Sequence, residues 1–203
     1  PEFVDIALKL RQEAGLTAMD PNKIRQSVSD GTSGMVQTAM ELSPDDPDFE
    51  FWRQRFLMHY SAGLGKKSST FPGLFELVTE LDNAGIAWGV VTNKAEKFAQ
   101  PLLNMMAFQP PPGVLITPDH VAYPKPDPEP ILLACKTLGC PSVRTIYVGD
   151  HLRDIESGRA AGCQTASAAY GYLAEGECVT EWRADVVAWS ASQLVKLIQE
   201  TFS

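Results

Sequence analysis

The sequence predicts an α/β fold: a Rossmann-like, doubly wound parallel sheet preceded by a small all-helical domain. Two observations support this prediction. From residue 69 onward, short apolar segments alternate with amphipathic helical segments, as in parallel sheets covered by helices on both faces. Before residue 69, every apolar pattern has the spacing of a helix. We therefore expect a helical domain over residues 1–68 and an α/β domain over residues 69–203.

The helical domain is expected to contain four helices. They cover residues 3–14, a segment that begins at Asp20-Pro21, residues 33–42 and residues 47–60. The last of these carries several aromatic side chains, which is typical of a helix-bundle core. The polar stretch 61–70 contains G-L-G-K-K-S-S-T. Its spacing does not match a phosphate-binding loop, so we interpret this stretch as a flexible hinge between the domains.

The α/β domain is expected to alternate five helices with five strands. The helices cover residues 74–83, 94–108, 128–138, 152–162 and 191–202, and the strands cover residues 86–92, 114–116, 145–148, 164–169 and 185–187. The strands are mostly apolar throughout, which predicts a parallel sheet with both faces covered. Residues 145–148 are accordingly expected to form a buried strand.

Composition narrows the classes of partner. The chain has 203 residues, a formal net charge of −8 at pH 7 and four cysteines without a C-x-x-C pair. An acidic protein is not attracted to nucleic acid or to an anionic membrane, so neither partner is expected. Residues 1–16 lack the pattern of a signal peptide, and no apolar run approaches the ~20 residues that span a bilayer. We expect a cytoplasmic monomer or homodimer whose thiols are not in disulfides.

Two aspartates follow the predicted strand 145–148. Gly149 ends the strand, Asp150 comes next, and Asp154 lies about one helical turn further on. In open α/β sheets, ligands bind at the carboxyl ends of the strands. Two carboxylates at such an end suit a hard cation such as Mg²⁺. The alternative is that Asp150 is a turn residue and Asp154 a first-turn helix acid, and this stretch alone does not decide between them.

Polar residues also follow the predicted strand 86–92 and occupy a proline-rich loop. Thr92 and Asn93 stand at the start of a helix, where a hydroxyl and backbone N–H groups bind anions. A plain helix cap is the alternative there. Lys125 lies between two prolines in Y-P-K-P-D-P-E-P, which restricts its backbone and suggests that its ammonium group faces an anion. The alternative is a solvated loop lysine.

The ordered set of these motifs resembles the haloacid dehalogenase-like phosphatase superfamily. The matching segments are V-V-T-N-K at 90–94, K-P-D-P at 125–128 and V-G-D-x-x-x-D-I at 148–155, and the similarity covers almost the whole chain. It is closest to the phosphoglycolate phosphatase group, in particular the branch that acts on N-acetylmuramic acid 6-phosphate. The resemblance identifies residues 1–68 as a helical cap and residues 69–203 as the phosphatase core.

The resemblance also implies a reaction and a role for each site residue. It implies Mg²⁺-dependent hydrolysis of a small phosphorylated metabolite, phosphoglycolate or N-acetylmuramic acid 6-phosphate, through an aspartyl-phosphate intermediate. Thr92 would bind the phosphoryl group through its hydroxyl, and Asn93 would assist through its backbone. Lys125 would neutralise phosphate and nucleophile charge. Asp150 would be a Mg²⁺ ligand, and Asp154 an outer-shell or water-mediated ligand.

One motif of that family is not found in the sequence. The strand followed by D-x-D-G-T supplies the nucleophilic aspartate, whereas Asp30-Gly31-Thr32 follows a helical pattern and has Val28 at the nucleophile's position. In this fold the missing strand is the centre of the sheet, so we expect it upstream of residue 1. Two alternatives stay open: a sugar phosphomutase of the same fold, or a catalytically inactive phosphate-binding module.

Substrate choice is expected to depend on the cap. Arg25, Ser33 and Met35 lie in the part of the cap segment that we expect to face the active-site crevice. For Arg25, the alternatives are a contact with a substrate carboxylate and an ordinary place on the surface.

Overall fold

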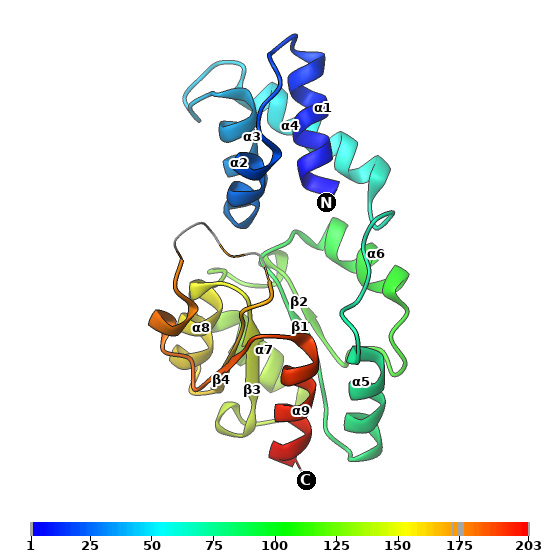
Figure 1. Ribbon diagram of the computed structural model, residues 1–203. Coiled ribbons are helices and arrows are strands. Elements are labelled where there is room, and N and C mark those ends of the chain that lie inside the picture. The colour runs from blue at the N-terminus through cyan, green and yellow to red at the C-terminus, as the bar shows by residue number, and fades with distance from the viewer. Residues whose placement is uncertain (1, 172, 174–176, 203) are drawn as a thin grey trace. The chain divides into compact units, whose positions relative to one another are not determined.

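The computed structural model describes residues 2–171, 173 and 177–202 (Figure 1). Within these residues the chain divides into a helical unit, residues 2–69, and an α/β unit, residues 70–171 and 178–202. Each unit has its own buried side chains.

The helical unit contains the four predicted helices. They are α1 (Glu2–Glu13), α2 (Pro21–Gln26), α3 (Gly31–Met40) and α4 (Phe49–Gly63), with a 3-10 turn (Ser27–Asp30) between α2 and α3. Asp20 caps α2 through a hydrogen bond from Asn22 N–H to its side chain, as Asp20-Pro21 predicted. Leu10, Ile24 and Phe56 are fully buried and form part of the core of this unit. Phe49, Phe56 and Tyr60 of α4 therefore serve packing, whereas Phe51 is exposed.

Two sequence expectations are settled inside this unit. Asp30 ends the 3-10 turn and Gly31 begins α3, so Asp30-Gly31-Thr32 lies in helical structure and is not a strand-end nucleophile. The sequence does not fix the direction of the Met35 side chain; in the structure it is 1% exposed and belongs to the core, so it does not face a substrate. Arg25 and Ser33 are exposed.

The α/β unit begins at α5 and ends at α9. Its helices are α5 (Leu74–Asn83), α6 (Glu96–Met106), α7 (Glu129–Leu138), α8 (Leu152–Ala160) and α9 (Ala191–Phe202), and its strands are β1 (Val90–Val91), β2 (Leu115–Ile116), β3 (Ile146–Gly149), β4 (Gln164–Ala168) and β5 (Val186–Ala188). Three short 3-10 turns cover Pro118–His120, Ser142–Arg144 and Val179–Trp182. All five predicted helices and all five predicted strands are present.

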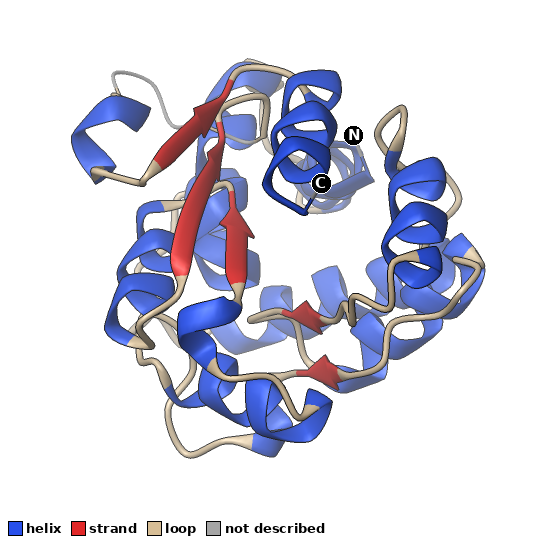
Figure 2. Cartoon of the chain, turned by 90° about the horizontal axis from the view of Figure 1, so that it is seen from below, coloured by secondary structure: helices blue, strands red, loops and turns tan. Residues whose placement is uncertain are grey.

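All strand pairs are parallel, as predicted, and the strands form two groups (Figure 2). β1 pairs with β2, with Val90 opposite Leu115, and β3, β4 and β5 pair in that order. Helices cover both faces of the second group. Ile146 and Val148 of β3 pack with Leu194 of α9, whereas Tyr147 packs against a cluster on α7 and α8. This alternation is that of a doubly wound α/β fold.

Two strand predictions need correction. The strand predicted over residues 86–92 pairs only at Val90–Val91, and β3 is half-buried throughout, whereas β4 is buried from its second residue. The physical reason is pairing. Within the described residues, β4 has a strand on each side, but β1 pairs only with β2 and β3 only with β4. A strand with one paired edge keeps part of its surface exposed.

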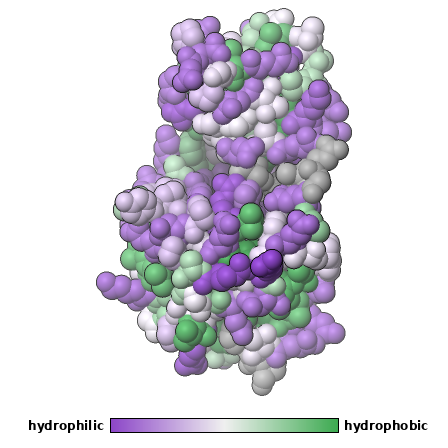
Figure 3. Space-filling model, turned by 90° about the vertical axis from the view of Figure 1, so that its left-hand side faces the viewer, coloured by the Kyte–Doolittle hydropathy of each residue, from purple (hydrophilic) through white to green (hydrophobic). Residues whose placement is uncertain are grey.

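The surface of the molecule mixes polar and apolar residues. Figure 3 shows small apolar groups among polar residues on the face that it presents. No helix within the described part of the chain has the length and apolar character that crossing a bilayer requires.

Candidate active site

Lys125 lies between the carboxyl ends of β1 and β3. Its Nζ donates hydrogen bonds to the carbonyl oxygen of Val91, the last residue of β1, at 3.0 Å and to the hydroxyl of Tyr147 in β3 at 2.8 Å. Thr92 directly follows β1, and Asp150 directly follows β3. The lysine side chain therefore brings together two strand ends that belong to different groups of the sheet.

Lys125 forms a buried ion pair. Its Nζ lies 2.8 Å from Oδ1 of Asp154, and the two side chains are 8% and 9% exposed. An ammonium group has three N–H donors, so Val91, Tyr147 and Asp154 satisfy all of them. Removing a charged side chain from water is costly unless it is paired and hydrogen-bonded in this way. The alternative interpretation of Lys125 as a solvated loop lysine is wrong.

Asn93 positions the loop that carries Lys125. Its side-chain amide donates to the backbone carbonyl of Lys125 at 2.9 Å, and the backbone N–H of Lys125 donates to Oδ1 of Asn93 at 3.2 Å. These two bonds join segments 32 residues apart and give both the N–H and the C=O of Lys125 a hydrogen-bond partner. The family resemblance implies a role for the Asn93 backbone; its side chain has a separate, positioning contact.

Thr92 is not the cap of the following helix. Its Oγ1 accepts the N–H of Lys94 at 3.1 Å, and α6 starts later, with Ala95 at its N-cap. The N–H of Glu96 donates to Asp119 at 2.8 Å, and this bond is the main reason why the pKa of Asp119 is lowered. The plain helix-cap interpretation is therefore wrong, and one amide at the start of α6 already has an anionic partner.

Asp154 is held over the end of β3. Its Oδ2 accepts the backbone N–H of His151 at 3.2 Å, while its Oδ1 faces Lys125. A Cβ atom at Gly149 would overlap the Asp154 side chain, so glycine at the strand end permits this placement. His151 is the N-cap of α8 and accepts the N–H of Arg153 at 3.1 Å. Asp154 is thus both a first-turn helix acid and the partner of Lys125.

Asp150 lies against the backbone of Gly171. A Cβ atom built at Gly171 would be 2.5 Å from Oδ2 of Asp150 and would clash with it. Asp150 is half-buried. Gly171 lies 21 residues after Asp150 in the chain, shortly after β4. The sequence around β3 therefore does not indicate this contact.

The two carboxylates fit a hard cation in different ways. The described residues contain no group of three His, Cys, Asp or Glu side chains that could hold a metal ion by themselves. Mg²⁺ is commonly held by one or two carboxylates together with water and substrate phosphate, so two aspartates are a sufficient protein contribution. Both oxygens of Asp154 already accept hydrogen bonds, which suits a contact through water. Asp150, half-buried directly after β3, is the second carboxylate at this strand end.

Tyr147 is a site residue that the sequence pattern did not reveal. Burial, and next the nearby charges of Asp154 and Asp150, raise the pKa of its phenol well above the ordinary value of 10. The phenol therefore stays neutral, accepts from Lys125 and donates to Val91 O at 3.3 Å. The available signal was a hydroxyl in an otherwise aliphatic strand, because a buried phenol needs a polar partner.

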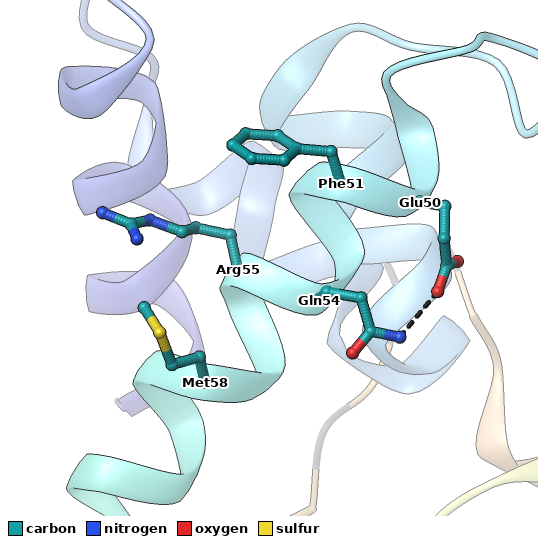
Figure 4. Close-up of a pocket in the computed structure, with 5 residues that line it drawn as sticks. All are labelled: Glu50, Phe51, Gln54, Arg55 and Met58. Atoms are coloured by element: carbon teal, nitrogen blue, oxygen red, sulfur yellow. Dashed lines mark hydrogen bonds between the residues drawn. The ribbon is translucent and has the colours of Figure 1, made fainter.

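A hollow of about 500 Å³ lies elsewhere, along α4 of the helical unit. It is lined by Glu50, Phe51, Gln54, Arg55 and Met58, all from one helix (Figure 4). Gln54 and Arg53 both donate to Glu50, which lowers the pKa of that carboxyl to about 2. The Glu50 carboxylate therefore already has hydrogen-bond donors on the same helix. None of the sequence-predicted site residues lines this hollow.

The chain is similar to a family of hydrolases and to two named phosphatases. A family model described as haloacid dehalogenase-like hydrolase matches residues 2–168. An N-acetylmuramic acid 6-phosphate phosphatase of Pseudomonas putida is 42% identical over 198 residues, covering 98% of this chain and 89% of the relative. A phosphoglycolate phosphatase of Xanthomonas campestris pv. campestris is 34% identical over 194 residues, covering 96% of this chain and 87% of the relative.

A solved structure shares the fold over the same extent. The crystal structure of a predicted phosphoglycolate phosphatase from Haemophilus somnus superposes with a TM-score of 0.85 and 22% sequence identity. The match covers 98% of this chain and 91% of that one.

Proposed function

The chain belongs to the haloacid dehalogenase-like hydrolase family, and from this premise we propose that it hydrolyses the phosphate monoester of a small metabolite. The observation that carries the proposal is the buried Lys125–Asp154 pair between the ends of β1 and β3. A fixed ammonium group, a hydroxyl at Thr92 and two carboxylates are the parts that phosphoryl transfer needs: charge neutralisation and positioning.

N-acetylmuramic acid 6-phosphate is the first candidate substrate and phosphoglycolate the second. The order follows the identities of the two relatives, 42% and 34%. Both molecules carry a carboxylate in addition to the phosphate. Arg25 and Ser33 are exposed in the helical unit and stay candidates for recognising the rest of the substrate.

In this proposal each residue acts on the transferring phosphoryl group. The Thr92 hydroxyl donates to one phosphoryl oxygen, and the Asn93 backbone assists it. Lys125 neutralises negative charge, with Asn93 fixing its backbone and Tyr147 and Asp154 fixing its ammonium group. Phosphatases of this family in general use a divalent metal; a Mg²⁺ ion held by Asp150 directly and by Asp154 through water supplies further positive charge when bound.

The nucleophile in this proposal is an aspartate on a strand that pairs with β1 and β3. Its carboxylate attacks phosphorus and forms an aspartyl phosphate, which water then hydrolyses. The open pairing of both strands supports this placement. The N–H groups of Val90 and Thr92 donate to Val114 and Ile116, on the β2 side, so the N–H and C=O of Val91 face the other way, where the C=O accepts from Lys125 and Tyr147. Within the described residues no aspartate occupies such a strand.

The test is phosphate release by the full natural protein. We expect it to release phosphate from N-acetylmuramic acid 6-phosphate or phosphoglycolate with Mg²⁺, and to stop when a chelator removes the metal. A coupled assay with a sugar 1-phosphate separates hydrolysis from mutase activity, because a mutase makes the isomer without releasing phosphate. Turnover of 2-haloacids that resists chelation, without phosphate release from any ester, would overturn the proposal, as would phosphate binding without turnover.

We further propose a cytoplasmic location and a monomeric or homodimeric state. Cell fractionation and light scattering at several protein concentrations test these two points.

A further inference from the structure

Three of the four cysteines gather behind Tyr147, on the side of the α7 cluster, and Cys135 and Cys163 belong to that cluster. Cys163 directly precedes β4, and Thr145, which contacts two more thiols, directly precedes β3. Because β3 and β4 are parallel, their first residues lie at one edge of the sheet, and Asp150 follows β3 at the opposite edge. The phosphate chemistry proposed above does not use these thiols.

The end of helix α7 brings Cys135 and Cys140 together. Cys140 N–H donates to Cys135 O at 3.0 Å, and Gly139 N–H donates to Lys136 O at 3.2 Å. Gly139 has a φ of 66°, the left-handed conformation that glycine adopts readily. This pair of bonds is a Schellman motif, which brings the residues at the two ends of the turn close together. Here those residues are both cysteines.

The hydroxyl of Thr145 lies beside both sulfur atoms. Its Oγ1 is 3.6 Å from Sγ of Cys135 and 3.7 Å from Sγ of Cys140. The turn in the backbone and the shared hydroxyl are independent observations, and both place the two sulfurs in one small region.

The three thiols differ in access to solvent. Cys140 is partly exposed, whereas Cys135 and Cys163 are 7% and 9% exposed. Burial, followed by the charge and hydrogen bond of Cys135, raises the pKa of Cys163 to about 12, so Cys163 stays protonated and is a poor nucleophile. Of these three thiols, Cys140 is therefore the one that a dissolved oxidant reaches first.

We propose that Cys140 and Cys135 form an oxidation site at which a hydroperoxide generates an intramolecular disulfide. The Cys140 thiolate attacks a peroxide oxygen and breaks the O–O bond, giving a sulfenic acid and, with the thiol proton, water. The Cys135 sulfur then attacks the sulfenic sulfur. An S–S bond forms, the S–O bond breaks, and the departing hydroxide takes the Cys135 proton to become a second water. Two thiols lose two electrons in total, and one hydrogen peroxide is reduced to two waters.

The disulfide would close a loop of only six residues, Cys135 to Cys140. A cross-link across so short a loop removes less entropy from the unfolded chain than one across a longer loop, so it adds less stability. We therefore expect the disulfide to be detected by its change in mass and by its reversal with a reductant.

The test treats the reduced, full natural protein with a few equivalents of hydrogen peroxide. We expect the intact mass to fall by about 2 Da, the loss of two hydrogen atoms, and to recover with dithiothreitol. Trypsin cuts after Lys136, between the two cysteines, so the disulfide should leave the peptide 137–144 joined to the peptide that ends at Lys136. Reduction should separate the two.

Variants make the assignment specific. Cys140→Ser, and separately Cys140→Ala, should abolish the cross-link, and Cys135→Ser should leave an oxidised Cys140 without a partner. Cys163→Ser and Cys178→Ser are the controls, since Cys178 is an exposed thiol outside the cluster, and both should form the cross-link as the natural protein does. A link from Cys163 to either partner, irreversible oxidation of Cys140 without a link, or no mass change would overturn the proposal.

Discussion

Arg11 and Lys125 are the buried cations among the described residues, and the two units treat them differently. Arg11, in the helical unit, is 4% exposed and donates to the backbone carbonyls of Thr17 at 2.9 Å and Ala39 at 2.6 Å. Its carboxylate contact, Glu41 at 3.4 Å, is 65% exposed. Arg11 thus satisfies one carbonyl group in the loop after α1 and one near the end of α3, and it joins α1 to α3.

Lys125, in the α/β unit, has a buried carboxylate as its closest charged partner. Asp154 is itself 9% exposed, and Asp150 lies four residues before it at the same strand end. Burial of a charged side chain therefore does not by itself identify a functional site. A buried cation surrounded by carbonyls completes the fold, whereas one paired with acids where parallel strands end provides the charge pattern that a phosphate and a cation require.

The largest effect should come from removing the Lys125 ammonium. We expect Lys125→Met to lower kcat by about 10²–10³-fold, the range found when one oxyanion donor is lost. Lys125→Arg keeps the charge but cannot place a single ammonium among three acceptors, so it should also be strongly impaired. Steady-state phosphate release measures both.

Lys196→Met is the matched control, because that lysine is 74% exposed and should leave kcat unchanged. Circular dichroism checks that each variant folds, since Asp154 loses its partner in Lys125→Met. A folded Lys125→Met variant with kcat within threefold of the natural protein would erase the distinction between the two cations.

The next largest effect concerns Asp150. We expect Asp150→Asn to lower activity about 10²-fold and to raise the Mg²⁺ concentration needed for half-maximal rate, because an amide binds a hard cation more weakly than a carboxylate does. A Mg²⁺ titration of phosphate release measures this. Asp82→Asn, an exposed change on α5, should behave as the natural protein. An unchanged Mg²⁺ dependence in Asp150→Asn would remove Asp150 from the metal site.

A smaller effect is expected at Tyr147. Tyr147→Phe removes one of three acceptors of the Lys125 ammonium, a hydrogen bond to a charged group worth about 1.5 kcal/mol, so kcat should fall about tenfold with KM little changed. Steady-state kinetics measures the split. A rise in KM alone would argue against a positioning role for this phenol.

The pKa of Tyr147 gives a second readout for the same variant. Because that pKa is raised in the folded state, the unfolded chain loses the phenolic proton first. Stability from this group is therefore complete below pH ~10 and declines as the pH rises above that value. Ionised tyrosine absorbs at about 295 nm. When the folded proteins are titrated to about pH 10, the rise in this absorbance should be the same in the natural protein and in Tyr147→Phe. A smaller change in the variant would mean that Tyr147 titrates normally.

Arg11 should give the smallest effect on catalysis and a clear effect on stability. Arg11→Met leaves the carbonyls of Thr17 and Ala39 without their donor, so we expect a loss of about 3 kcal/mol in the free energy of unfolding. The kcat of the folded variant should stay within twofold. Urea unfolding gives the stability.

Arg53→Met is the control for Arg11, because the Arg53–Glu50 pair is exposed and such pairs contribute at most about 1 kcal/mol. A loss of kcat in Arg11→Met that exceeds its loss of folded protein would make Arg11 more than a structural residue.

The sequence predicted most of the fold because helices depend on local patterns. Residues 74–83 and 191–202 were predicted as helices with the bounds that α5 and α9 have in the structure. Strand length and burial were predicted less well. β1 is shorter than residues 86–92, and β3 is half-buried, because pairing between distant segments decides both properties.

In the candidate site as well, local sequence motifs indicate some features and distant contacts decide the others. Short motifs at strand ends and in a proline-rich loop single out Thr92, Lys125, Asp150 and Asp154 as candidates. The contacts that hold them in place were not found. Asn93 reaches a backbone 32 residues away, and Gly171 makes room for Asp150 across the sheet, so neither leaves a pattern in the neighbouring sequence. Gly149 was interpreted only as the end of a strand, although it also makes room for Asp154.

The most direct test of the central claim is the affinity of the protein for inorganic phosphate, measured by calorimetry at a fixed Mg²⁺ concentration. Three forms of the full protein are compared: the natural protein, Lys125→Met and Arg11→Met. If Lys125 forms part of the phosphate site and Arg11 is structural, the dissociation constant should rise at least tenfold in Lys125→Met and stay unchanged in Arg11→Met. Equal affinity in the natural protein and in folded Lys125→Met would contradict the account.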